Sequence, residues 1–376
     1  MSTVRFAPDA GSFQLILNFA GCTETTCEGQ NATSEPTRTL SLIALCTPPR
    51  QAVPSGETKE TALDQIARPL DPAKFRDPFV TAKGETRATV ALRALETLWF
   101  NTGTLCNLTC RNCYIDSSPR NDRLAWLSLA EVETYLDEIA RDRLPTKLIG
   151  FTGGEPFMNP DIIAMLEAVL SRGLDALVLT NAMKPLRKRR AEMLALRDRY
   201  GARLTIRVSI DHHDPAQHEQ ERGRRSWAPA LDGLIWLARN GFATDIAGRR
   251  FTGESEAALR DGFARLIAGH DIPIDASDPV RLMLFPEMEP ERDVPEITTA
   301  CWGILNKSPD DVMCAGARMV VKRQGASAPV VLACTLLAYD PRFEMGTTLA
   351  EASRPVSLNH PFCASFCVLG GASCSR

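Results

Sequence analysis

Apolar residues between about residues 95 and 285 fall into short continuous runs, separated by longer amphipathic stretches. Apolar runs of about four to eight residues bounded by turn residues are typical of strands buried in a parallel sheet. The alternation predicts an α/β fold of parallel βαβ units, either an open sheet or a partial barrel. The expected strands are Glu96–Phe100, Lys147–Phe151, Ala176–Thr180, Leu204–Ile210, Phe242–Ile246 and Val280–Phe285.

The stretches between these runs carry signals for helix ends. Ser128 and Glu131 have the spacing of a capping box, which predicts a helix that runs to about Arg141. Asn159-Pro160 supplies an N-cap followed by proline at the first helical position. Helices are expected to stop at Gly173, Gly201 and Asn240-Gly241.

The two flanks of this region have a different character. The first holds two strand-like stretches, 13–19 and 40–45, and then a linker-like stretch rich in Pro, Thr and Lys. The last loses the alternation and becomes rich in cysteine. We therefore expect an N-terminal appendage of unknown role (1–92), a core (93–286) and a Cys-rich C-terminal extension (287–376).

Cysteine, glycine and polar residues follow the first four predicted strands. They are Cys106, Cys110 and Cys113 after the first, Gly153-Gly154-Glu155-Pro156 after the second, Asn181 after the third, and Ser209 and Asp211 at the end of the fourth. Chemistry in such folds gathers at the carboxyl ends of the strands. This rim is the predicted active site.

Composition narrows the class of protein. The chain has 376 residues, 44% apolar and 24% charged, with a formal net charge of −3, so nucleic acid is not an expected partner. A basic run at 184–190 is interpreted as a solvated helix face, and His212, His213 and His218 as a solvent-exposed loop. No apolar run approaches the roughly 20 residues that span a bilayer, and the first residues do not look like an export signal. We expect a cytoplasmic protein that does not insert into membranes.

The twelve cysteines are clustered along the chain. In a reducing compartment such clusters bind metal or do redox work more often than they form the disulfide framework of a secreted protein. Cys106, Cys110 and Cys113 place three thiolates within eight residues, and thiolates are the usual ligands of iron–sulfur clusters. Three ligands leave one iron of a four-iron cluster open for a small molecule. A zinc knuckle is the alternative, but it requires a fourth Cys or His nearby.

These residues resemble motifs of the radical SAM (S-adenosylmethionine) superfamily, whose signature is C-x3-C-x2-C. Residues 151–156 resemble its second motif, which contacts the methionine amino group of SAM. Thr180-Asn181 resembles the end of its third strand, and residues 208–211 resemble the fourth-strand motif beside the ribose and carboxylate. The resemblance covers about residues 95–285 and implies a partial (β/α)6 TIM-like barrel. One departure is Asn112, where many members carry an aromatic residue.

The resemblance implies a cofactor set and a reaction. A [4Fe–4S] cluster on the three cysteines would receive an electron from a flavodoxin or ferredoxin and cleave SAM to a 5′-deoxyadenosyl radical, which abstracts hydrogen from a substrate. The implied SAM contacts are Gly153, Gly154, Glu155, Asn181, Ser209 and Asp211.

The C-terminal cysteines resemble the SPASM or twitch extension of many radical SAM enzymes. That resemblance implies one auxiliary iron–sulfur cluster, drawn from Cys314, Cys334, Cys363, Cys367 and Cys374. Cys301 is interpreted as a buried apolar residue, and Cys22, Cys27 and Cys46 have no spacing that we interpret. A peptide or protein substrate is favoured, with a small molecule as the alternative. A non-catalytic electron-transfer protein is the rival from another class.

Overall fold

The structure, a computed structural model, describes residues 68–372 of the chain. The predicted strands at 13–19 and 40–45 lie outside these residues, as do Cys22, Cys27, Cys46 and Cys374. Within the described part, no helix is long and apolar enough to cross a lipid bilayer.

Six parallel strands form the centre of the fold, each hydrogen-bonded to the strand that follows it in the chain. They confirm the predicted α/β pattern, with bounds shifted by a few residues. The strands are β2 (Thr97–Asn101), β3 (Leu148–Thr152), β4 (Asp175–Thr180), β5 (Leu204–Ser209), β6 (Ala243–Arg250) and β7 (Leu282–Pro286).

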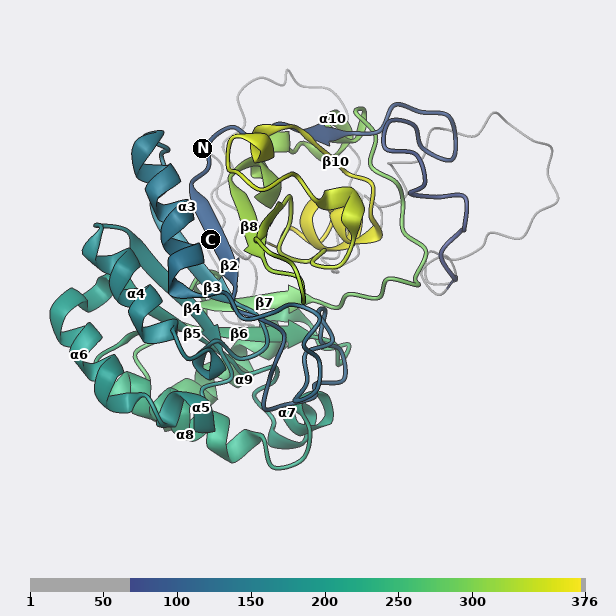
Figure 1. Ribbon diagram of the computed structural model, residues 1–376. Coiled ribbons are helices and arrows are strands. Elements are labelled where there is room, and N and C mark those ends of the chain that lie inside the picture. Colours follow the sequence, from purple (N-terminus) through teal and green to yellow (C-terminus); the bar gives the residue numbers. More distant parts are fainter. Residues whose placement is uncertain (1–67, 373–376) are drawn as a thin grey trace, which may run out of the picture. The chain divides into compact units, whose positions relative to one another are not determined.

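Helices connect these strands and lie along the outer side of the sheet (Figure 1). They are α3 (Leu129–Arg141), α4 (Ile162–Ser171), α5 (Lys184–Arg187), α6 (Arg190–Tyr200), α7 (Pro215–Arg222), α8 (Trp227–Arg239) and α9 (Glu256–Gly269). Short helical turns are η1 (Pro156–Met158), η2 (Gly201–Arg203), η3 (Pro309–Asp311), η4 (Met313–Ala315), η5 (Pro341–Phe343) and η6 (Glu351–Ser353).

The predicted helix ends were mostly correct. The capping box of Ser128 and Glu131 is present at the start of α3, and Gly201 caps α6 with a φ of 59°. The N-cap assigned to Asn159 was wrong, because α4 begins at Ile162 after Asp161. The Asn159 side chain still accepts from the Asp161 N–H at 2.8 Å, and its amide donates to the carbonyls of Thr102 and Leu127, tying this turn to the end of β2 and the start of α3.

The C-terminal region extends the sheet, which the sequence pattern did not predict. β8 (Ala317–Val321) pairs in parallel with β2, and β9 (Val330–Leu332) pairs antiparallel with β8. Figure 1 shows β8 beside β2, so the edge of the first barrel strand is covered. The remaining elements are α10 (Cys301–Leu305), β1 (Thr89–Val90), β10 (Val356–Ser357) and a π-helix at Cys363–Val368, η7.

The described end of the predicted appendage packs against the C-terminal region. β1 pairs with β10, and isolated bridges join Pro69 to Arg292 and Arg87 to Thr298. Residues 68–90 therefore form a strap over segments that lie more than two hundred positions later in the chain.

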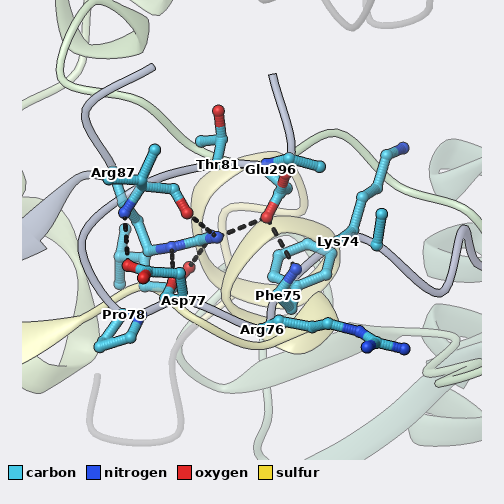
Figure 2. A network of polar contacts seen from close by, with 12 residues as sticks. Lys74, Phe75, Arg76, Asp77, Pro78, Thr81, Arg87 and Glu296 are labelled. Atoms are coloured by element: carbon cyan, nitrogen blue, oxygen red, sulfur yellow. Dashed lines mark hydrogen bonds and ion pairs between the residues drawn. The ribbon is translucent and has the colours of Figure 1, made fainter. Parts of the chain in front are cut away.

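A buried ion pair holds this strap, as Figure 2 shows. The guanidinium of Arg87 pairs with Glu296 and donates to the carbonyls of Asp77 (2.8 Å) and Val80 (3.1 Å). Glu296 also accepts from the backbone N–H groups of Phe75 and Ala82, each at 2.7 Å. Both charges are buried, so removal of either side chain leaves the other buried without an opposite charge.

We predict that Arg87→Met lowers the free energy of unfolding by about 3–5 kcal/mol, since it leaves Glu296 as an unpaired buried charge. Chemical unfolding of the full chain measures this. Arg93→Met is the matched control, because Arg93 pairs with Glu96 at the surface, and we expect a change within about 0.5 kcal/mol. Equal losses in the two variants would contradict the role assigned to Arg87.

Candidate active site and cysteine pocket

The predicted rim residues lie together because their strands are parallel and adjacent. The amide Nδ2 of Asn181, after β4, lies 3.9 Å from the sulfur of Cys106, after β2, and 3.0 Å from Oδ1 of Asn107. Asp211, after β5, acts electrostatically on the thiol of Cys110. Ser209 is half-buried at the end of β5, opposite Ala247 of β6.

The cysteine loop (residues 106–113) presents three sulfurs, of which that of Cys106 belongs to a buried residue and those of Cys110 and Cys113 to half-buried ones. Burial raises the pKa of Cys106 to about 12, against a hydrogen bond from the Leu108 N–H at 3.4 Å, and the charge of Glu155 adds to the rise. Burial also raises the pKa of Cys110, and the Ser117 N–H donates to the sulfur of Cys113 at 3.3 Å. None of these three thiols is in a disulfide. The thiols of Cys106 and Cys110 are therefore expected to ionise only when a metal group takes the sulfur as a ligand.

The spacing of the thiols bears on the zinc alternative. A single metal ion needs at least three ligand atoms close together. In the described part of the chain, the group of His, Cys, Asp or Glu side chains that meets this, with all ligand atoms within 4.8 Å of one another, is His212, His213 and Glu254. It includes no cysteine. At least one pair of the three sulfurs therefore lies more than 4.8 Å apart, which favours a cluster of several irons over a single ion.

The glycines of the turn after β3 are required by packing against the cysteine loop. A Cβ on Gly154 would lie 2.2 Å from the carbonyl oxygen of Leu105. One on Gly153, whose φ is +137°, would lie 2.6 Å from the carbonyl oxygen of Gly103. The N–H of Gly154 donates to that Gly103 oxygen at 2.8 Å. The two glycines therefore allow the turn after β3 to pack closely on the backbone of residues 103–105.

Glu155 links the same turn to β4. Its side chain is 2% exposed, and its carboxylate accepts from the Thr180 hydroxyl (2.8 Å), the Asn181 N–H (2.9 Å) and the Phe157 N–H (3.1 Å). Burial raises the pKa of Glu155 to about 7, although these three hydrogen bonds oppose the rise. A carboxylate has about four acceptor positions, so about one is left for a further donor.

Arg222, at the end of α7, is a site residue that the sequence analysis missed. It donates to Asp211 at 2.9 Å, and its Nε is buried without a partner. Burial alone would lower the pKa of this guanidinium, but Asp211 and the thiols of Cys110 and Cys106 outweigh burial and raise it. Only the fold brings Arg222 beside a loop that precedes it by more than a hundred positions.

The neighbouring residue Glu221 holds the cysteine loop in place. Its backbone carbonyl accepts from the Arg111 N–H at 2.8 Å, and its carboxylate accepts from the Asn112 side chain at 3.0 Å. Arg249, on β6, pairs with the same carboxylate at 3.0 Å. Asn112, which replaces an aromatic residue common at this position, is thus used to dock the loop on α7.

The three histidines after β5 are not a solvent-exposed loop, which corrects the interpretation made from the sequence. His212 and His218 are buried, and burial lowers the pKa of His218 to about 4. Nδ1 of His212 accepts from the Asp214 N–H at 3.0 Å, so its Nε2 carries the proton and faces Glu254 at 2.8 Å. A metal would need the lone pair of that nitrogen, so the contact is a hydrogen bond.

A second site gathers four of the C-terminal cysteines around one pocket. Cys314, Cys334, Cys363 and Cys367 line one small pocket that is partly open to solvent, and the other lining residues are apolar. Cys363 and Cys367 come from the π-helix η7, a rare element that is common at functional sites. Burial raises the pKa of Cys314 to about 11 and that of Cys363 well above its usual value.

Cys301 is separate from this pocket. It is fully buried, and its sulfur lies 3.5 Å from both the backbone nitrogen and the hydroxyl of Thr298. It does not line the pocket, in agreement with its interpretation as a buried apolar residue.

Comparison with known proteins places this geometry in context. Residues 100–253 match the radical SAM superfamily. The bacteriocin subtilosin biosynthesis protein AlbA of Bacillus subtilis is 29% identical over 143 residues, 38% of this chain and 30% of AlbA. GTP 3′,8-cyclase of Aeromonas hydrophila is 29% identical over 145 residues, 37% of this chain and 40% of that enzyme. The match therefore spans less than half the length of either relative.

Among solved structures, SuiB of Streptococcus suis bound to S-adenosylmethionine is similar, with a TM-score of 0.50 at 13% identity. The similarity covers 68% of this chain and 63% of SuiB. At this identity it bears on the fold alone, and it confirms the predicted partial barrel.

We predict that Gly154→Ala disrupts the cysteine loop, because the new methyl group would overlap a backbone carbonyl that cannot move easily. The expected cost is about 1–3 kcal/mol of stability, with reduced iron uptake on anaerobic reconstitution. Gly269→Ala, where nothing lies within 4 Å of the added Cβ, should leave iron uptake unchanged. Full iron uptake and stability in Gly154→Ala would show that the close approach is unimportant.

Proposed function

Because residues 100–253 of this chain belong to the radical SAM superfamily, we propose that the protein reductively cleaves S-adenosylmethionine and uses the resulting radical to abstract hydrogen from a substrate. The observation that carries this proposal is the set of three thiols on one loop, one buried and two half-buried, beside the rim of a partial barrel. The family uses a [4Fe–4S] cluster and SAM as cofactors.

We assign Cys106, Cys110 and Cys113 as ligands of the first cluster. The sulfurs fit such a group, since at least one pair of them lies more than 4.8 Å apart, which is wide for the ligands of one ion, and none of them is in a disulfide. When bound, the cluster supplies the electron that splits SAM into methionine and a 5′-deoxyadenosyl radical.

The chain's own residues would hold SAM and keep out water. The unused acceptor position of Glu155 suits an ammonium group, and Arg222 carries an unpartnered buried N–H suited to a carboxylate. Asp211 would keep Arg222 in place through their ion pair. Gly153, Gly154, Asn181 and Ser209 are the remaining proposed SAM contacts.

We assign the pocket of Cys314, Cys334, Cys363 and Cys367 to one auxiliary iron–sulfur cluster. Four thiolates complete the ligands of such a cluster without Cys374. A fully ligated cluster has no open iron for a substrate, so electron transfer is the role that this ligand set favours. The proposed core thus spans residues 93–286, and the auxiliary region spans 287–376.

A low-potential flavodoxin or ferredoxin is the proposed electron donor. Such donors, and thiols kept out of disulfides, are typical of the cytoplasm, where we propose that the reaction takes place.

The substrate class that we favour is a peptide or protein. AlbA, by its name, acts in the biosynthesis of a bacteriocin, and this relative supports the peptide class. The similarity to GTP 3′,8-cyclase favours a small molecule as the second candidate.

The reaction predicts formation of 5′-deoxyadenosine when the reconstituted protein is incubated without air with SAM and dithionite. Cys110→Ser should abolish this product, because a weaker ligand replaces one of three thiolates. Cys301→Ala, a buried cysteine away from both sites, is the matched control and should retain the product. Production at the wild-type rate by Cys110→Ser would contradict the ligand assignment, and its absence from the wild type would favour an electron-transfer protein.

The substrate class predicts how cell extract affects that assay. A low-molecular-weight extract should stimulate 5′-deoxyadenosine formation, and protease digestion of the extract, with the protease then removed, should abolish the stimulation. Stimulation that survives digestion, or that GTP alone reproduces, would favour a small-molecule substrate.

A further inference from the structure

Arg318 is a buried cation beside the four-cysteine pocket. It lies on β8, its side chain is 1% exposed, and its Nη1 donates to the carbonyl of Cys314 at 2.6 Å. Its other hydrogen bonds go to the backbone carbonyls of Ala317, Ala352 and Arg354, at 2.7, 2.8 and 3.3 Å. All of these partners are neutral, and no ion pair in the described part of the chain includes Arg318.

A guanidinium remains protonated in proteins, and a buried charge without an opposite charge is costly. Arg87, which also acts on the thiol of Cys363, is balanced by Glu296. The titratable groups that act on Arg318 are Cys314 and Cys334, which carry a negative charge only as thiolates. The opposite charge for Arg318 must therefore come from the pocket, once these cysteines become thiolates.

We propose that Arg318 is the counter-charge of the auxiliary cluster and raises its reduction potential. The proposal rests on the cluster assignment given above. A cluster held by four thiolates is negative, and reduction adds one electron without adding a proton. A nearby buried cation stabilises the more negative reduced form more strongly than the oxidised form.

The test is a redox titration followed by electron paramagnetic resonance. Cys106, Cys110 and Cys113 are all changed to Ala in the full chain, so that only the pocket holds iron. In this background, Arg318→Met should lower the equilibrium constant for reduction by at least about tenfold, or about 59 mV for a one-electron couple. Arg318→Lys keeps the charge and should stay within about threefold of the parent.

Arg323→Met is the matched control, because it removes one positive charge from a partly exposed arginine that pairs with Glu344 at 2.6 Å. Solvent screening should keep its effect on reduction within about threefold. Thermal unfolding before and after reconstitution adds a second readout. Arg318→Met should reduce the stability gained on cluster uptake. If Arg318 had a purely structural role, the substitution would lower the unfolding temperature of the cluster-free and the cluster-loaded protein by the same amount.

The outcomes separate the two proposals. If the parent takes up no iron, or if adding Cys334→Ala leaves iron uptake unchanged, the auxiliary cluster assignment fails. If the cluster forms and Arg318→Met leaves its potential unchanged, the role of Arg318 is overturned. If Arg318→Met assembles no cluster, the Arg318→Lys variant tests the role instead. A cluster in Arg318→Lys with a reduction potential close to that of the triple-Ala parent supports the role, and failure of this variant to assemble a cluster overturns it.

Discussion

The hydrogen bonds of Glu155 hold the ends of three strands together, and the geometry of the rim depends on them. Its backbone N–H donates to the Leu105 carbonyl of the segment that enters the cysteine loop, at 3.2 Å. Its buried carboxylate binds the end of β4 through Thr180 and Asn181. Gly153 and Gly154 permit this contact, because a side chain at either position would overlap residues 103–105. The candidate site is thus fixed by loops that pack on one another.

The two cysteine sites differ in how their charge is balanced. Near the cysteine loop, Arg222 is paired with Asp211, so the protein's own charges there largely cancel. Beside the four-cysteine pocket, Arg318 contacts only neutral carbonyls. At the cysteine loop, the net charge of the loaded site would therefore depend on the groups that bind there. At the four-cysteine pocket, the unbalanced charge of Arg318 already favours an anion. This difference fits an open site for a charged cofactor and a closed site for electron transfer.

Much of the fold was predictable because its signals are local. The apolar runs marked the six central strands β2–β7, and Ser128 and Glu131 marked the start of α3. The rim followed from parallel strand order, and the clustered cysteines marked both candidate sites. What could not be predicted depends on contacts between distant segments. The addition of β8 to β2 and the positions of Arg222 and Arg318 leave no periodic pattern in the sequence.

The errors have physical reasons as well. His212 and His218 lie in a polar stretch of sequence, but His212 packs against Phe251 and His213, and His218 packs against Trp227. Asn159 has the residue type of an N-cap and accepts from the Asp161 N–H, but its amide is also tied to β2 and α3, and the helix starts only at Ile162. In both cases tertiary contacts outweigh a preference that sequence alone suggests.

The central claim is that three thiolates leave one iron open for the amino-acid end of SAM. Electron–nuclear double resonance on the reduced protein, with SAM carrying a heavy nitrogen isotope in its amino group, tests this most directly. The Cys334→Ala variant serves best, since only the first cluster should then contribute. A nitrogen coupling strong enough for a direct iron–nitrogen bond is the predicted result. A cluster that forms at the loop but shows no such coupling with bound SAM would contradict the account.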